Sequence, residues 1–152
     1  SRNELFISYL LFDEDLVLIT HPSHRFAIDG NVDINEVAKE PLILYSAESS
    51  YFLLIEEVCN QAGITPNIEI RVDSVDSIKS MVAMGLGISF VPVSSIQKEI
   101  NQGTLVQIPL GPTSRVLIST CVLTHREEKS NKSVNAFISI LQDLYSKWPI
   151  KS

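Results

Sequence analysis

The amino-acid sequence predicts an α/β fold in which strands and helices alternate around a mostly parallel sheet. Short apolar runs alternate with amphipathic segments from residue 41 to residue 108. One apolar helical stripe ends at the pair Gly85 and Gly87, and a short apolar strand follows it over 88–91. With 152 residues, of which 45% are hydrophobic, the chain is long enough to bury one good core and to form two small lobes.

Composition excludes several classes of protein. The net charge is -6, and the twelve basic residues are scattered along the chain rather than gathered, which argues against a nucleic-acid surface on this segment. No apolar run approaches the roughly 18 residues of a membrane span, and the start does not resemble a signal peptide. Cys59 and Cys121 are expected to be buried and reduced. We therefore expect a cytoplasmic protein that does not contact a membrane.

The first segment is expected to form two strands, over 5–11 and 16–21, joined by an exposed acidic turn at 13–15. Three adjacent carboxylates could also suggest a cation site. Calcium ligands, however, alternate over a longer segment, so no metal is assigned. A polar connection leads to a short helix near 33–38, which must end before Pro41.

The pattern becomes regular after Pro41. A buried strand over 42–45 is followed by a serine-rich loop and by a helix that Gly63 closes. The helix is expected to bury one face, made of Tyr51, Ile55, Val58, Cys59 and Ala62. The strand over 67–72 alternates apolar and polar residues, so it has a solvated side or lies near an edge. Asp73 or Ser74 then caps the next helix.

The inner face of that next helix is expected to consist of Ile78, Met81, Val82 and Gly85. A helix over about 93–101 ends at Gly103, and a strand follows over 105–108. A turn at Gly111 and Pro112 leads to a long strand over 115–124. The chain closes with an amphipathic helix that Pro149 terminates, and its stripe is Val134, Phe137, Ile138, Leu141, Leu144, Tyr145 and Trp148.

The loop from Tyr45 to Ser50 is the best candidate for a binding site. A buried strand ends there and a helix begins, so free backbone N–H groups and hydroxyls converge where an anion can be held. Ligands of open α/β sheets also lie beyond the carboxyl ends of the strands. Helix capping alone would explain the same serines equally well. A second helix start, at Asp73 and Ser74, carries a carboxylate that disfavours an anion.

Other motifs do not indicate chemistry. The Gly85 and Gly87 corner follows a helix and opens a strand, the reverse of a dinucleotide-binding turn, so we expect a helix terminus and a close-packing position. The three histidines lack metal-ligand spacing. No serine sits in a nucleophile elbow, and Cys59 lies mid-helix on a buried face. The sequence predicts neither a catalytic residue, nor a metal, nor a cofactor.

The order of several short motifs resembles the effector-binding domain of LysR-type transcriptional regulators. These motifs are the strand 16–19 leading into His21-Pro22 and Ala27, the strand 41–45, the segment 82–88 ending at Val91-Pro92, and Gly103-Thr104-Leu105-Val106 before a proline. Each motif is weak by itself. Their order and spacing cover most of the chain and are fairly specific.

This resemblance implies a fold like that of type 2 periplasmic binding proteins, with two α/β lobes, two crossing strands and a small effector in the cleft. It assigns 1–40 to the end of the proximal lobe and the crossover, and 41–110 to one complete distal effector-binding lobe. The return strand and last helix of the proximal lobe take 111–152. The effector-binding positions that it implies are Tyr45, Ser46, Ala47, Ser49, Asp73 and Ser74.

The family's winged helix-turn-helix and the opening elements of its proximal lobe have no counterpart in these residues. The expected function is therefore effector sensing, in which a small molecule, an anion by our expectation, modulates DNA binding by that absent domain. The incomplete lobe favours association with another copy or with the absent segment. A transport solute-binding protein of the same fold is the alternative. An enzyme on this fold would need catalytic residues from outside this stretch.

Overall fold

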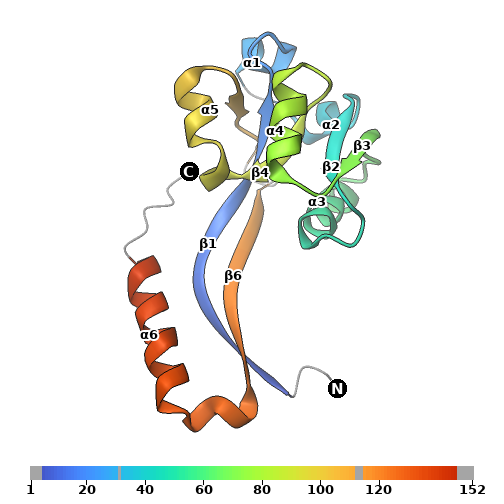
Figure 1. Cartoon of the computed structure of the whole chain (residues 1–152). Helices are drawn as coiled ribbons and strands as arrows, with labels where there is room; N and C mark the ends of the chain where they lie inside the picture. The colour runs from blue at the N-terminus through green and yellow to red at the C-terminus, as the bar shows by residue number, and fades with distance from the viewer. Residues whose placement is uncertain (1–4, 31, 112–114, 147–152) are drawn as a thin grey trace. The chain divides into compact units, whose positions relative to one another are not determined.

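The computed structural model describes residues 5–30, 32–111 and 115–146. The chain divides into two compact units, Asp15–Leu117 and Ser1–Glu14 with Ile118–Ser152. Strands β1 (Phe6–Thr20) and β6 (Val116–His125) pair with each other, and each contributes residues to both units (Figure 1). Residues 15–40 belong to the larger unit, whereas the sequence-based division begins its distal lobe at 41. The assignment of lobes after the LysR family remains a prediction.

The strands of the larger unit pair in both directions rather than mostly in parallel, and they belong to two sheets. Strand β1 pairs antiparallel with both β4 (Ser89–Pro92) and β5 (Val106–Ile108). Strands β2 (Leu42–Tyr45) and β3 (Ile68–Val72) pair in parallel, with Tyr45 opposite Val72. A parallel bridge from Leu42 to Ile88 connects the two sets. The α/β fold is confirmed. The antiparallel part consists of β1 and its partners β4 and β5.

Two helices follow β2 and β3 and contact β2. Helix α3 (Ser50–Gln61) buries Ile55 and Cys59 as predicted. Its third buried residue, Phe52, was not on the predicted face, and Ala62 is exposed. Helix α4 (Val75–Ala83) buries Ile78 and Val82, whereas Met81 is half-buried and Gly85 is exposed. The predicted faces are therefore correct at their centres and wrong at their margins.

The glycines at the two helix ends and in the corner behave as the sequence predicts. Gly63 and Gly85 have positive φ angles of 69° and 74°, a conformation that only glycine adopts at little cost. A β-carbon on Gly87 would lie 2.4 Å from the carbonyl oxygen of Pro41. That oxygen accepts a hydrogen bond from the N–H of Ile88 at 3.0 Å. Gly87 is therefore a close-packing position between β2 and β4.

The remaining elements of the larger unit are short. Helix α2 (Ile34–Val37) ends before Pro41 as expected. Helix α1 (Arg25–Asp29) was not predicted, because its residues were read as part of a polar connection. The predicted helix after β4 is a 3₁₀ turn at Val93–Ser95 and then α5 (Gln97–Gln102), which Gly103 caps in the left-handed region. The predicted turn at Gly111 and Pro112 lies partly outside the described residues.

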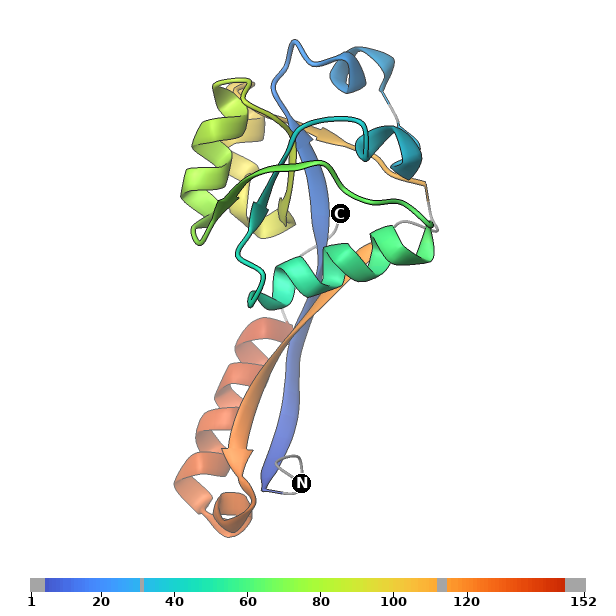
Figure 2. The same cartoon turned by 90° about the vertical axis from the view of Figure 1, so that its right-hand side faces the viewer.

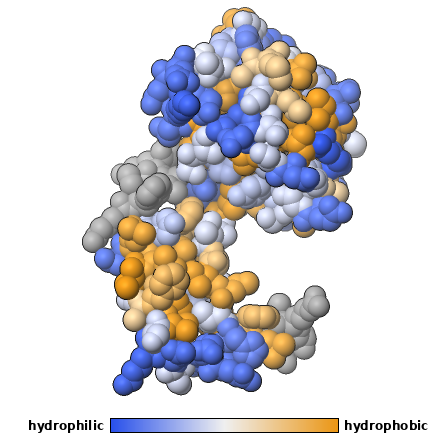
Figure 3. Space-filling view, in the orientation of Figure 1, coloured by the Kyte–Doolittle hydropathy of each residue, from blue (hydrophilic) through white to orange (hydrophobic). Residues whose placement is uncertain are grey.

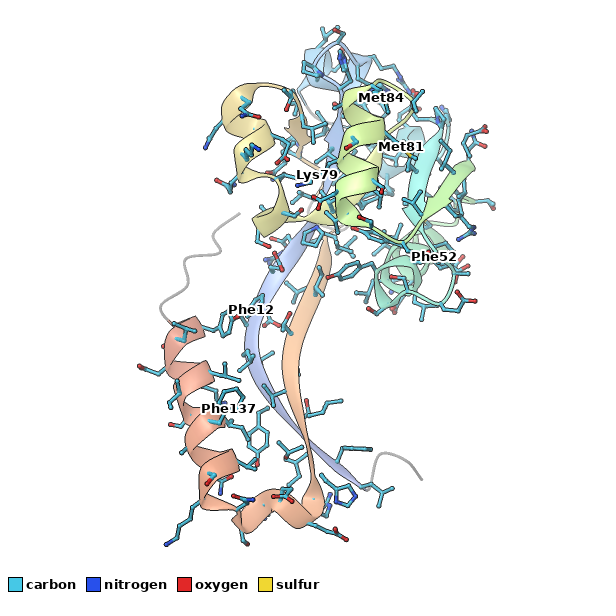
Figure 4. The ribbon with its side chains drawn as sticks, in the orientation of Figure 1. Phe12, Phe52, Lys79, Met81, Met84 and Phe137 are labelled. Atoms are coloured by element: carbon cyan, nitrogen blue, oxygen red, sulfur yellow. The ribbon has the colours of Figure 1, made fainter. Side chains whose placement is uncertain are left out.

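Lys79 connects α4 to the segment around α5 (Figure 4). Its ammonium lies 3.1 Å from a carboxylate oxygen of Glu99 and 3.1 Å from one of Asp76, and it donates to the carbonyl of Ser95 at 2.9 Å. Burial of the Glu99 carboxylate raises its pKa and is the largest single effect, but the hydrogen bonds to the carboxylate and the charges of Lys79 and Lys98 together outweigh it, so the pKa lies below its usual value.

The predicted acidic turn at 13–15 is wrong, because these residues continue a single long strand. Glu14 and Asp15 are buried. The guanidinium of Arg115 binds the carboxylate of Asp15 through two hydrogen bonds, of 2.5 and 3.1 Å, and Ser119 donates to Asp13 at 2.6 Å. Arg115 and Ser119 therefore bind carboxylates that water would solvate if these residues formed an exposed turn.

In the smaller unit, helix α6 (Lys132–Ser146) runs beside β1. The rings of Phe12 and Tyr145 stack at 5.0 Å, and Gln142 donates to the carbonyl of Leu10 at 3.4 Å. Ile138 is the only buried residue among those described in α6. Figure 3 shows a broad apolar surface here. Trp148 and Pro149, the predicted end of the stripe, lie outside the described residues.

Cys121 corrects another expectation. It lies in β6 and is exposed, whereas Cys59 is buried as expected. Side chains alternate between the two faces of a strand, and β6 alternates between less and more exposed positions after Val116. Cys121 lies on the more exposed face, so the burial that the apolar run predicted for it is wrong.

The Gly87 corner gives a direct test. Gly87→Ala is expected to destabilise the protein by more than about 2 kcal/mol, because the β-carbon would overlap the carbonyl oxygen of Pro41. Gly111→Ala is the matched control, since a β-carbon there meets nothing within 4 Å and its φ angle is not positive. Urea denaturation measures both variants. Equal stability of the two would contradict the close-packing role.

The Lys79–Glu99 pair predicts a pH dependence. The pKa of Glu99 is lowered in the fold, so its stabilisation is complete above the unfolded-state pKa and is lost as the pH falls through the folded-state pKa. The difference in unfolding free energy between the native protein and Glu99→Gln should therefore shrink from about pH 7 to about pH 3. Denaturation at several pH values tests this, and a constant difference would exclude it. Gln102→Glu provides a control carboxylate at an exposed position of the same helix.

Candidate functional site

The parallel register of β2 and β3 brings two of the predicted site residues together. Tyr45 and Val72 are partners at the strand ends, so Ser46 and Asp73 are the first residues beyond them. The hydroxyl of Ser46 donates a hydrogen bond to the carboxylate of Asp73. Figure 2 shows the loops that follow the two strands at the same end of the sheet. Residues 27 positions apart in sequence thus meet where two helices begin.

The loop after β2 is a tight turn that leads into α3. The N–H of Ser49 donates to the carbonyl of Ser46 at 2.9 Å, and the Ser49 hydroxyl caps α3 by accepting from the N–H of Tyr51 at 3.2 Å. Ser49 thus performs the capping role that its sequence position also allowed. Ala47 is exposed, and in the described part of the chain no acceptor is found for the backbone N–H groups of Ala47 and Ser50. These N–H groups remain available to water or to a ligand.

The second helix start is capped in the same way. The Ser74 hydroxyl accepts from the N–H of Ser77 at 3.5 Å, a long contact. The positive ends of two helix dipoles, those of α3 and α4, therefore meet near Ser46 and Asp73. The carboxylate of Asp73 lies at the start of α4, where a negative charge is stabilised.

Tyr45 adds a buried polar group. The residue is 3% exposed, and among the described residues its hydroxyl has no hydrogen-bond partner. The rings of Tyr45 and Tyr51 are in edge contact, with centroids 4.9 Å apart. Burial, and to a smaller degree the neighbouring Tyr51, raises the pKa of Tyr45 well above its usual value. The Tyr45 phenol is therefore neutral and keeps its proton.

Arg71 is a residue that the sequence reasoning missed. Its guanidinium donates to the carbonyl of Tyr45 at 3.3 Å and lies 4.5 Å above the ring of Phe52, which Figure 4 labels on α3. The strand pattern placed Arg71 on a solvated face, but it did not indicate that this face adjoins the loop. The structure thus brings one cation to the serine loop.

Other candidate ligating groups make local contacts. The Nδ1 atom of His21 accepts from the N–H of Ser23, and those of His24 and His125 accept from Phe26 and Glu127. Over residues 5–30, 32–111 and 115–146, no cluster of three metal-ligating side chains occurs. In the same ranges no helix has both the length and the apolar character needed to cross a bilayer.

Comparison with known proteins identifies the family. The family model described as the LysR substrate binding domain matches residues 2–146. A probable RuBisCO transcriptional regulator from Cyanophora paradoxa is 36% identical over 96 residues, which cover 61% of this chain and 30% of that protein. The HTH-type transcriptional regulator CitR of Bacillus subtilis is 25% identical over 86% of this chain and 45% of its own length. The chain thus spans less than half of these relatives.

Solved structures agree at the level of the fold. The Synechocystis CcmR regulatory domain in complex with 2-PG superposes with a TM-score of 0.84 at 18% identity, over 95% of this chain and 70% of that one. The effector-binding domain of QuiR in complex with shikimate gives 0.80 at 17% identity, over 97% and 69%. These relatives are regulators, which does not favour the transport protein as the alternative. The family match over residues 2–146 shows that the chain belongs to the LysR substrate-binding domain family.

Proposed function

We propose that this chain is the effector-sensing part of a cytoplasmic LysR-type transcriptional regulator, and not an enzyme. A small anion would bind at the loop 45–50 and the start of α4, using Tyr45, Ser46, Ala47, Ser49, Asp73 and Ser74. DNA would be bound by a helix-turn-helix domain outside this chain. The names of the relatives as HTH-type and RuBisCO transcriptional regulators support the class.

The observation that carries the site proposal is the convergence at the ends of β2 and β3. The register brings together Ser46 and Asp73, and with them the N-termini of two helices of 12 and 9 residues. The free N–H groups of the loop and the Ser46 hydroxyl are donors that suit an oxyanion. Arg71 supplies positive charge beside the loop.

The regulatory step follows from differential binding. An effector that binds one conformation of the regulator more tightly than another shifts the population toward it, and by linkage it changes DNA affinity by the corresponding factor. The donors of the loop and of the α4 start come from two loops of the same unit. An effector that engages both would favour the arrangement in which they lie together.

We also propose that the full regulator is a homo-oligomer. In the smaller unit, Phe137, Ile140 and Leu144 of α6 are between 58 and 64% exposed. Leu10 and Leu123 are exposed on the strands beside them. Such apolar surface favours association, and sedimentation velocity of the full-length protein would test it.

Ser46→Ala is expected to weaken anion binding by about tenfold, because it removes a hydroxyl that can donate to a charged group. Calorimetry of the full-length protein with shikimate, 2-PG and inorganic phosphate as probes would measure the change. Ser80→Ala is the control, since this hydroxyl of α4 bonds to the carbonyl of Asp76 within its own helix. Equal loss in both variants would contradict a role of the loop.

DNA binding tests the function as a whole. The full-length protein should change its affinity for its own promoter DNA when the probe that binds in calorimetry is added, and Ser46→Ala should require about tenfold more of it. Fluorescence anisotropy with labelled DNA measures both. If bound probe left DNA affinity and oligomeric state unchanged, the sensing proposal would be wrong.

A further inference from the structure

The Asp73 carboxylate accepts the hydrogen bond that an anionic effector would need from Ser46. The Ser46 hydroxyl, one of the side-chain donors of the loop, already donates a hydrogen bond to the Asp73 carboxylate. Both side chains are the first beyond paired strand ends, so the backbone register fixes them as neighbours. The carboxylate thus lies where the N-termini of α3 and α4 attract negative charge.

Few interactions fix the position of the Asp73 carboxylate. Among the described residues it takes part in no ion pair, and the nearby cation, Arg71, is directed to the carbonyl of Tyr45 and the ring of Phe52. Asp73 is exposed, so its carboxylate can turn to water at little cost. A carboxylate that is bound through one hydroxyl and not paired with a cation is readily exchanged for another anion.

We infer that Asp73 is a specificity-determining residue that acts as an internal competitor for anionic effectors. This inference rests on the proposed function. An effector oxyanion accepts the hydrogen bond of Ser46, and the carboxylate of Asp73 swings away into solvent. Weakly binding anions fail to displace it, whereas an effector with further contacts to the loop N–H groups succeeds. The competitor therefore sets a threshold against abundant simple anions such as inorganic phosphate.

The alternative is a structural link that merely ties the two loops together. Asp73→Asn separates the two roles, because asparagine keeps an acceptor oxygen for Ser46 while a neutral amide replaces the charged carboxylate. A structural link predicts unchanged anion affinity. Internal competition predicts a gain, because the like charge at a few ångströms is gone.

The experiment measures phosphate and shikimate binding to the full-length protein by calorimetry. Asp73→Asn is expected to bind inorganic phosphate about fivefold or more tightly than the native protein. Asp73→Ser, which removes the charge with a shorter side chain, should do the same. Glu56→Gln is the control, because it changes the net charge equally at an exposed position in the second turn of α3.

Each outcome decides the question. Tighter binding in both Asp73 variants but not in Glu56→Gln supports competition, including the case where only the variants bind measurably. Unchanged or weaker binding overturns it while leaving the proposed function intact. If neither the native protein nor any folded variant binds an anion, the anionic effector and the internal competitor are both wrong. Thermal melting verifies that each variant is folded.

Discussion

The close approach of β4 to β2 is the constraint on which the rest of the larger unit depends. The N–H of Ile88 donates a hydrogen bond to the carbonyl of Pro41 at 3.0 Å, and the carbonyl of Ile88 accepts one from the N–H of Ile43 at 2.9 Å. These two bonds connect the parallel pair β2–β3 to the antiparallel set around β1. A side chain on Gly87 would prevent them. The orientation of β2, and so the place where its loop emerges, therefore follows from one residue without a β-carbon.

The long strand β1 shows what the sequence could not reveal. Three consecutive carboxylates predict an exposed turn under any local rule, because a lone buried charge is costly. The cost of burying Asp15 is offset here by Arg115, which is 100 positions away in sequence. Ser119 donates a hydrogen bond to the exposed Asp13. No local pattern contains such a partner. The same limit explains Cys121, whose exposure depends on which face of β6 is covered and not on the apolar run around it.

Most of the fold could be predicted because its elements are determined locally. The periodicity of apolar residues predicted the helices after β2 and β3. The positive φ angles needed at the helix ends explain why glycine occupies positions 63, 85 and 103. The positions of Ser46, Ser49 and Ser74 at helix starts were predictable in the same way. Their convergence depends on the parallel register, and the contacts of Arg71 depend on packing against Phe52. The sequence thus indicated the candidate donors but not the neighbours that modulate them.

Those neighbours determine what kind of recognition is possible. A chain with a net charge of -6 repels anions at long range, so it gains little from electrostatic steering. At the proposed site, anion binding would then have to come from short-range donors whose geometry is fixed in advance. Backbone N–H groups and a serine hydroxyl would provide this, because they require no buried cation and lose little conformational entropy on binding. A nearby carboxylate makes such a site stricter, since only an anion whose shape satisfies several donors together compensates for its repulsion.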